Sequence, residues 1–352
     1  MSLVIWPSLA LVLLILLVLV RRSRLGERSG VRVARISRGR DETRTLWING
    51  IARTFHVHVP DKLAASRPAS VVLVFHGGGR GRGRSIARRT GFSALSERHE
   101  CLAVYPDGYG FGWNDGRGTT EAERAGTDDV AFVRAVIDDL ENRFFIDRER
   151  IYAVGLSNGG MFVNRLGCEL SDRLAAIAVV CGPMPEPLAT RCRPERPISV
   201  LGIFGTADPF IPWEGGEVRG GDRGQVLGAE AMIDLWVKSN RCDSRPVTEV
   251  LPTVIEDGTV VERTTYGGGD EGRTVVLYRI EGGGHSWPCG RTAPRRGARS
   301  SLNLDATRVI WEFFLAQPPR SAGSLAAAGS APGAADSRGM PGWSRWLRGR
   351  RE

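Results

Sequence analysis

Short apolar runs alternate with amphipathic helical segments along most of this chain, and this alternation restricts the folds open to it. Residues 70–75 have the sequence SVVLVF, which is rich in β-branched residues and too short for a buried helix, so it predicts a buried strand. Strands are expected at residues 70–75, 101–105, 151–154, 175–181, 198–204 and 274–280. Helices are expected at residues 84–98, 128–144, 158–168, 229–239 and 304–315. The pattern predicts an α/β fold with a mostly parallel central sheet flanked by helices on both faces.

Residues 43–60 precede this alternating region and contain two short β-like runs. Asn49 and Gly50 separate the runs, and both residue types tolerate the positive φ angles of a type I′ turn. We therefore expect a β-hairpin ahead of the parallel strands.

The net charge of +9 is concentrated near the two ends of the chain. Residues 21–40 carry a net charge of +7 and residues 317–352 one of +4, whereas residues 41–316 carry −2. A nucleic-acid-binding domain places a basic stripe on its folded part. The charge distribution therefore argues against a nucleic-acid partner.

The composition divides the chain into four parts. The tail is rich in Ala, Gly, Ser and Pro and is expected to be disordered. The parts are a hydrophobic segment (1–20), a basic linker (21–42), a folded α/β domain (43–316) and the basic tail (317–352).

The N-terminal segment has no charged side chain through residue 20. As a helix, residues 3–20 would be about 27 Å long, near the lower limit for crossing a bilayer. A cleavable signal peptide has basic residues before its apolar core, whereas here Arg21, Arg22 and Arg24 follow it. An uncleaved membrane anchor is therefore favoured over a signal peptide, and the positive-inside rule would place the domain in the cytoplasm.

The six cysteines point to the opposite side of the membrane. An even number of cysteines suits disulfides in an oxidising compartment, and six allow 15 pairings. Cys181 equally fits a buried thiol, because it ends an apolar run. Both locations, membrane-anchored and secreted, stay open.

The sequence GLSNG at residues 155–159 matches the pattern Gly-x-Ser-x-Gly. Chance matches are common in a chain with 45 glycines, so the flanking segments matter. The match follows a predicted strand and opens a predicted helix, which is the strand–turn–helix setting of a nucleophile elbow. Ser157 is therefore the candidate nucleophile, and the N–H of Asn158 is a candidate donor to an oxyanion.

A run of glycines follows the first predicted parallel strand, directly after His76. Glycines let the main chain approach a substrate, and main-chain N–H groups commonly stabilise the oxyanion of acyl transfer. The second donor is expected from Gly77 or Gly78, with His76 shaping the loop. A phosphate-binding loop is disfavoured, because neither of the usual glycine patterns occurs with the correct flanking segments.

Asp208 and His285 each follow a predicted strand, at 198–204 and 274–280. The carboxyl ends of parallel strands build the sites of open α/β sheets. The chain order Ser, Asp, His is that of α/β-hydrolases and differs from the orders of chymotrypsin and subtilisin. We therefore predict Ser157, Asp208 and His285 as a catalytic triad.

Five other side chains have two possible roles each. His56 and His58 are two positions apart and share one face of a predicted strand, so they could bind a metal. No acidic or cysteine partner is near in sequence, so a structural role and no metal are expected. Tyr109, Trp113 and Trp287 could form an aromatic wall for an acyl group and are equally plausible as core residues.

The chain resembles the polyhydroxybutyrate depolymerase-like esterases, which are related to feruloyl and acetylxylan esterases. The motifs that carry the resemblance are FHGGG (75–79), YPDG (105–108), WND (113–115), DDVAFVRAVIDDL (128–140), GLSNGG (155–160), GTADPFIPW (205–213) and GGGHSWP (282–288). The resemblance implies an α/β-hydrolase fold and a secreted or envelope-associated serine esterase without a metal or organic cofactor. Short-chain, hydroxyalkanoate or aryl esters, small or oligomeric, are the implied substrates.

Two alternatives use the same scaffold. A serine peptidase or an acyltransferase would share the triad and the acyl-enzyme, so the sequence separates these activities from an esterase only weakly. A non-catalytic binding protein on a hydrolase scaffold is disfavoured. A protein without activity could lose Ser157, Asp208 or His285 at no cost, whereas this chain has all three.

Overall fold

A computed structural model of the chain describes residues 39–79, 81–290 and 299–320. The hydrophobic segment 1–20, the linker up to residue 38 and the tail from residue 321 lie outside the described residues. Within these ranges, no helix combines the length and the apolar character needed to cross a membrane.

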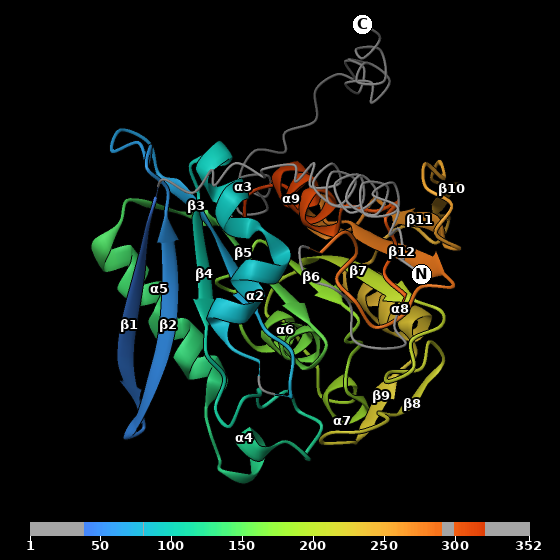
Figure 1. The fold of residues 1–352 in the computed structure, drawn as a ribbon, viewed down its shortest axis with the longest axis horizontal. Coiled ribbons are helices and arrows are strands. Elements are labelled where there is room, and N and C mark those ends of the chain that lie inside the picture. The colour runs from blue at the N-terminus through green and yellow to red at the C-terminus, as the bar shows by residue number, and fades with distance from the viewer. Residues whose placement is uncertain (1–38, 80, 291–298, 321–352) are drawn as a thin grey trace, which may run out of the picture. The chain divides into compact units, whose positions relative to one another are not determined.

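A ten-stranded sheet forms the centre of the domain (Figure 1). The six strands from β4 to β12 run parallel to one another, and two antiparallel strands extend the sheet at each edge. The predicted mostly parallel sheet is confirmed. In spatial order the strands are β1 (Arg40–Ile48), β2 (Ile51–Val59), β4 (Leu102–Pro106), β3 (Ala69–Phe75), β5 (Ile146–Leu156), β6 (Ala176–Val180), β7 (Ser199–Gly205), β12 (Val275–Glu281), β11 (Val260–Tyr266) and β10 (Val247–Val250).

Helices cover the sheet on both faces, and the alternation of side chains along the strands explains why. In β3, Leu73 and Phe75 belong to one buried cluster, whereas Val72 and Val74 belong to the other. Both faces of the strand are therefore apolar, which is why its sequence reads as a continuous hydrophobic run. One cluster includes α5 (Asp129–Arg143), α6 (Asn158–Glu169) and α8 (Ala229–Ser239), and the other includes α2 (Gly83–Thr90), α3 (Phe92–His99) and α9 (Ala306–Ala316).

The single helix expected at residues 84–98 is two helices, α2 and α3. Gly91 lies between them with a φ of 77°, in the left-handed conformation that ends many helices, and its N–H donates to the carbonyl of Ala87. The apolar periodicity continues across this residue, so the pattern alone did not reveal the break.

Elsewhere, turns and helix starts predicted from local sequence signals are confirmed. Asn49 and Gly50 have φ angles of 50° and 80° and form the turn between β1 and β2. Asp128 begins α5 by accepting a hydrogen bond from the N–H of Ala131. Several elements were not predicted: β8 (Gly215–Glu217), β9 (Gln225–Leu227), α4 (Glu121–Arg124), α7 (Glu186–Ala189), a 3-10 turn (Asp270–Gly272), and the antiparallel strands β10 and β11.

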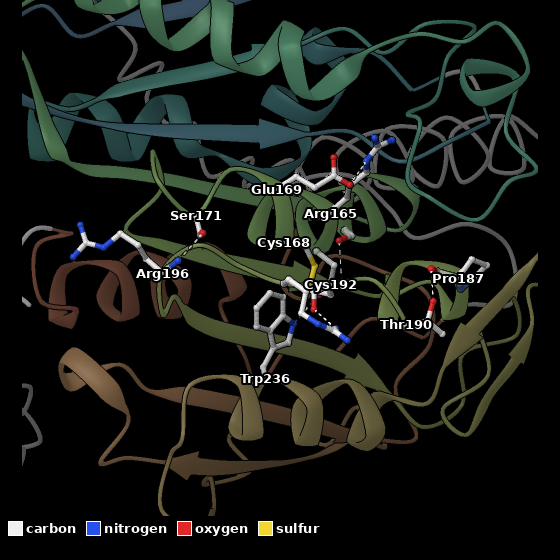
Figure 2. The surroundings of a disulfide bond; sticks show 12 residues. Arg165, Cys168, Glu169, Ser171, Pro187, Thr190, Cys192, Arg196 and Trp236 are labelled. Carbon is white, nitrogen blue, oxygen red and sulfur yellow. Dashed lines mark hydrogen bonds and ion pairs between the residues drawn. A yellow bond between two sulfur atoms is a disulfide. The ribbon is translucent and has the colours of Figure 1, made fainter.

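One disulfide joins Cys168 in α6 to Cys192 in the segment between α7 and β7. Figure 2 shows this bond near Trp236 of α8. The bond ties the helix that starts beside Ser157 to the chain leading into β7. The other four cysteines are free thiols: Cys101 and Cys181 are buried, Cys242 is half-buried and Cys289 is exposed.

Candidate active site

Ser157 occupies a sharp turn between β5 and α6. Its φ of 58° and ψ of −125° lie in a region that non-glycine residues rarely adopt. A Cβ added at Gly155 would lie 2.1 Å from the carbonyl oxygen of Gly159, and one at Gly159 would lie 2.4 Å from that of His76. Both glycines are therefore required by close backbone contacts, and the predicted strand–turn–helix arrangement around Ser157 is confirmed.

Asp208 and His285 contact each other beyond the ends of β7 and β12. The Nδ1 of His285 donates to Oδ2 of Asp208 over 2.7 Å. The other carboxylate oxygen accepts the backbone N–H groups of Phe210 and Ile211, at 2.8 and 2.9 Å. The carboxylate is thus held in one orientation. With Nδ1 engaged as a donor, the neutral imidazole leaves its Nε2 as a hydrogen-bond acceptor.

A cavity of about 350 Å³ brings the predicted residues together. Ser157 and His285 both line it, with Gly77, Gly78 and Asn158 beside them. These residues follow β3, β5 and β12, so the carboxyl ends of the parallel strands converge here, as expected for an open α/β sheet.

The glycine run after β3 passes directly against the serine. A Cβ added at Gly77 would lie 3.2 Å from the Cβ of Ser157, and one at Gly78 would lie 3.7 Å from the Cβ of Asn158. A side chain at Gly77 would therefore crowd the serine turn, whereas one at Gly78 would make an ordinary van der Waals contact.

His76 holds this glycine loop as a neutral imidazole. Its Nδ1 lies 2.8 Å from the carbonyl oxygen of Gly77, and its Nε2 accepts the N–H of Gly108 at 2.9 Å. Nδ1 must carry the proton, because a carbonyl only accepts and an N–H only donates. Burial lowers the pKa of His76 to about 4, which keeps the ring uncharged at neutral pH.

The side chain of Asn158 is clamped at both ends. Its Oδ1 accepts the backbone N–H of Trp113 at 2.9 Å, and its Nδ2 donates to Oδ2 of Asp115 at 2.6 Å. Asp115 is fully buried and pairs with Arg117 at 2.9 Å. Sequence reasoning did not single out Asp115 or Arg117, although Asp115 belongs to the motif WND.

The three aromatic residues expected as a substrate wall do not line this cavity. Trp113 is fully buried, stacks on Phe162 and donates its indole N–H to the carbonyl of His76. Trp287 is also buried and packs against Phe92. Large rings gain more free energy from burial in the core than from a half-exposed wall. Tyr109, the third aromatic residue, is not one of the residues that line the cavity.

Apolar contact in the cavity comes instead from the segment after Asp208 and from α6. The ring of Phe210 lies 5.4 Å from the ring of His285. Met161, Ile211 and Val218 pack together beside it and also line the cavity.

His56 and His58 have structural contacts. His58 is buried between Asp41 and Glu97, at 2.7 and 2.9 Å. His56 contacts Thr43 and Asp107. These acidic partners are distant in sequence and were therefore missed by a search for nearby ligands.

Cys181 lies behind the Asp208–His285 pair, with its sulfur within 4.8 Å of their ligand atoms. Burial raises the pKa of this thiol, and its S–H points to the carbonyl of Ser286 at 3.3 Å. Cys181 is thus the buried thiol that its apolar surroundings in the sequence suggested.

A parallel sheet with a serine turn after β5 and an Asp–His pair after β7 and β12 defines an α/β-hydrolase. No family model matches the chain. It is 32% identical over 264 residues to the putative esterase NocK of Nocardia uniformis subsp. tsuyamanensis, covering 72% of this chain and 76% of that protein. The chain belongs to this esterase family and is a carboxylic-ester hydrolase.

Two further likenesses agree with this assignment. Feruloyl esterase C of Emericella nidulans is 28% identical over 285 residues, covering 79% of this chain and 90% of that protein. The solved acetyl xylan esterase from Aspergillus awamori superposes with a TM-score of 0.52 at 15% identity, covering 78% of this chain and 98% of that one. The likeness to the acetyl xylan esterase shows the fold. The expected resemblance to esterases is confirmed by the two relatives in sequence, NocK and feruloyl esterase C.

Proposed function

We propose that the chain hydrolyses esters through an acyl-enzyme on Ser157, with Asp208 and His285 completing the triad. The observation that carries the proposal is the 2.7 Å contact between His285 and Asp208 at a cavity that Ser157 also lines. The strained backbone of Ser157 supports it, because such strain is found where a site holds a reacting group.

In the first half-reaction the Oγ of Ser157 attacks the ester carbonyl carbon while Nε2 of His285 takes the hydroxyl proton. Asp208 holds the imidazole tautomer and stabilises the imidazolium that forms. The carbonyl oxygen becomes an oxyanion, which accepts the N–H of Asn158 and that of Gly77 or Gly78. The C–O bond then breaks, and His285 returns the proton to the departing alkoxide.

In the second half-reaction water takes the place of the alcohol. The water oxygen attacks the carbonyl carbon of the acyl group on Ser157, and His285 removes a proton from the water as it does so. Collapse of this second intermediate releases the carboxylic acid, and the proton returns to Ser157. The cycle uses these side chains, the backbone N–H donors of the oxyanion hole, and water.

The substrate is proposed to be an ester with a short-chain, hydroxyalkanoyl or aryl (feruloyl-like) acyl group. The cavity volume of about 350 Å³ lies near the lower end of small-molecule sites. Phe210, Ile211, Val218 and Met161 offer an apolar surface to such a group. The relative named as a feruloyl esterase adds support for the aryl class.

The proposed location is the cell envelope or its exterior, with the protein secreted or tethered. The disulfide between Cys168 and Cys192 supports an oxidising compartment. Residues 1–20 would supply the export signal or the tether. Mass spectrometry of non-reduced peptides from the native host would test the disulfide, and finding both thiols free would contradict this location.

Replacement of Ser157 by alanine tests the proposed nucleophile. The variant should lose hydrolysis of p-nitrophenyl butyrate by at least about a thousandfold while its unfolding midpoint stays near that of the wild type. A fluorophosphonate probe should label the wild type and leave Ser157→Ala unlabelled. Retained turnover in the variant would overturn the assignment.

A substrate panel separates the esterase from its alternatives. Short alkyl esters, feruloyl esters and aminoacyl amides are compared by kcat/KM, with alcohols added as competing acceptors. A peptidase would prefer the amides, and an acyltransferase would transfer to the alcohols in preference to water. A folded chain that turns over none of these and resists the probe would be a binding protein.

A further inference from the structure

A buried ion pair lies directly behind the proposed oxyanion hole. Asp115 has no exposed surface, and the side chain of Arg117 is 4% exposed. The Nε and a terminal nitrogen of Arg117 each lie 2.9 Å from Oδ2 of Asp115. Another terminal nitrogen donates to the carbonyl of Arg223 at 2.5 Å. The carboxylate is therefore held by Arg117, which contacts the same oxygen, Oδ2, as the amide of Asn158.

Burial raises the pKa of the Asp115 carboxyl, and the charge of Arg117 opposes that rise. A buried ion pair contributes little net stability compared with apolar residues of the same size, because both charges lose their hydration. One reason to keep such a pair is that it holds another group in a defined position. Here the group in contact is the amide of Asn158.

The segment that carries this pair also joins the two halves of the oxyanion hole. The backbone N–H of Trp113 donates to Oδ1 of Asn158, and its indole N–H donates to the carbonyl of His76, both at 2.9 Å. Asn158 provides one proposed donor, and the glycines after His76 provide the other. One rigid segment thus contacts both sides of the hole.

We propose that Asp115, held by Arg117, is a positioning residue for the oxyanion hole. It fixes the side chain of Asn158, and through it the first peptide N–H of α6, at the place where the oxyanion forms. The inference rests on the proposed function, because it assigns the N–H of Asn158 to the oxyanion. Donors placed in advance stabilise a transition state at no cost of reorganisation.

Asp115→Asn is the primary test. The carboxamide has nearly the same shape, but its N–H₂ group faces a donor in either orientation, because Oδ1 of Asp115 accepts the backbone N–H of Arg117 and Oδ2 accepts from Asn158 and Arg117. We expect kcat for p-nitrophenyl butyrate to fall by about 10- to 100-fold with KM within about twofold, less than the 10²- to 10³-fold cost of losing a donor altogether.

The direction of this effect separates position from charge. Removing the negative charge leaves Arg117 unpaired near the hole, and a purely electrostatic effect would therefore raise kcat. A fall in kcat supports positioning, and a rise or no change overturns the proposal.

A transition-state analogue distinguishes a misplaced hole from a general loss of structure. Butylboronic acid forms a tetrahedral anionic adduct with an active serine, so its affinity depends on the oxyanion donors. Its Ki should rise by the same factor by which kcat/KM falls in Asp115→Asn. An unchanged Ki beside a lowered kcat/KM would contradict the proposal.

Asn158→Ala and the double variant show whether Asp115 acts through the amide. Asn158→Ala keeps the peptide N–H but removes the clamp, so its kcat should fall to a similar degree. Adding Asp115→Asn should then change kcat by less than about twofold, since coupled residues are not additive. Fully multiplicative effects would overturn the proposal. Asn158→Ala alone still tests the clamp if Asp115→Asn does not fold.

Asp129→Asn is the matched control. Asp129 is also fully buried, pairs with Arg53 at 2.5 Å and holds the N–H of Asn114, the residue before Asp115. Among the described contacts, none joins Asp129 to Asn158 or His76. The control should lower the unfolding midpoint but leave kcat within about twofold. A loss of kcat equal to that of Asp115→Asn would reduce the proposal to general packing.

The tests keep this inference separate from the proposed function. If Ser157→Ala stays active, the proposed function fails and the hole has no nucleophile beside it. If Ser157→Ala is inactive while Asp115→Asn and Asn158→Ala have wild-type kcat, the esterase mechanism stands and only the positioning role is lost.

Discussion

His285 donates a hydrogen bond to Asp208 over 2.7 Å, although 77 positions separate the two residues in the chain. The contact follows from the pairing of β7 with β12, in which Gly205 lies opposite Ile280. The loops that continue from these strands touch, since a Cβ at Gly205 would lie 2.3 Å from the carbonyl oxygen of Gly283. The absence of a side chain at Gly205 lets the loops carrying Asp208 and His285 approach.

Replacing Asp208 by Asn should lower kcat for p-nitrophenyl butyrate by about 10⁴-fold with little change in KM. An amide can present its N–H₂ to Nδ1, and the imidazole then carries its proton on Nε2, where it no longer acts as a base. The backbone N–H groups of Phe210 and Ile211 can still bind the amide oxygen, so the fold should persist. Activity within tenfold of the wild type would remove Asp208 from the mechanism.

The stability of the protein should depend on the ionisation of His76. Its pKa is lowered from 6.5 to about 4 by burial, so between these two values the unfolded chain binds a proton that the folded chain does not. Stability from this residue is therefore complete above pH 6.5 and decreases as the pH falls toward 4. The total loss is about 3 kcal/mol.

Urea denaturation at pH 7, 6, 5 and 4 measures this effect. In His76→Gln the free energy of unfolding should change less with pH than in the wild type, by about 3 kcal/mol over the same range. Carboxylates titrate in both proteins, so the difference isolates His76. Parallel curves would show that His76 is not buried as a neutral ring.

Positive charge at the mouth of the cavity should favour anionic esters. Apart from the histidines, four residues with charged side chains line the cavity: Arg89, Arg117, Arg219 and Asp222. Arg117 is neutralised by Asp115, and Asp222 lies 3.9 Å from Arg124. Arg219 is exposed and forms no ion pair with any residue that the structure describes.

Arg219→Glu should lower kcat/KM for a p-nitrophenyl monoester of succinic acid by about fivefold at low salt, as expected for a screened charge reversal at the surface. Turnover of p-nitrophenyl butyrate, which is similar in size and uncharged, should stay within twofold. Arg223→Glu is the matched control, because Arg223 neighbours the cavity and pairs with Glu217. Equal effects of both variants on both esters would contradict a role for Arg219.

The sequence predicted the parts of the fold that depend on local periodicity. Continuous apolar runs indicated the parallel strands, and the strand before Ser157 with the helix after it indicated the elbow. The strands β10 and β11 were missed. In the edge strand β10, Val247–Val250, every residue is exposed, so its sequence has no hydrophobic alternation. The break at Gly91 was missed because one glycine inside a helical pattern is usually tolerated.

Sequence reasoning named the residues at the strand ends but not those that support them. Asp115 carries no local sign of its role, since an acidic residue after Trp-Asn reads as an ordinary loop residue. Trp113 was equally consistent with a cavity wall and with the core, and only its stacking on Phe162 decided between them. These outcomes depend on contacts between distant segments, which local patterns do not encode.

The sequence by itself determined the class of fold, the turn at Ser157 and the positions of Asp208 and His285 after strands, because periodicity and glycine placement act over a few residues. The tertiary structure decided that Asp208 meets His285, that His76 stays neutral and that Asp115 contacts Asn158. Those facts follow from the order and register of the strands and from burial. Both arise only when the whole chain is packed.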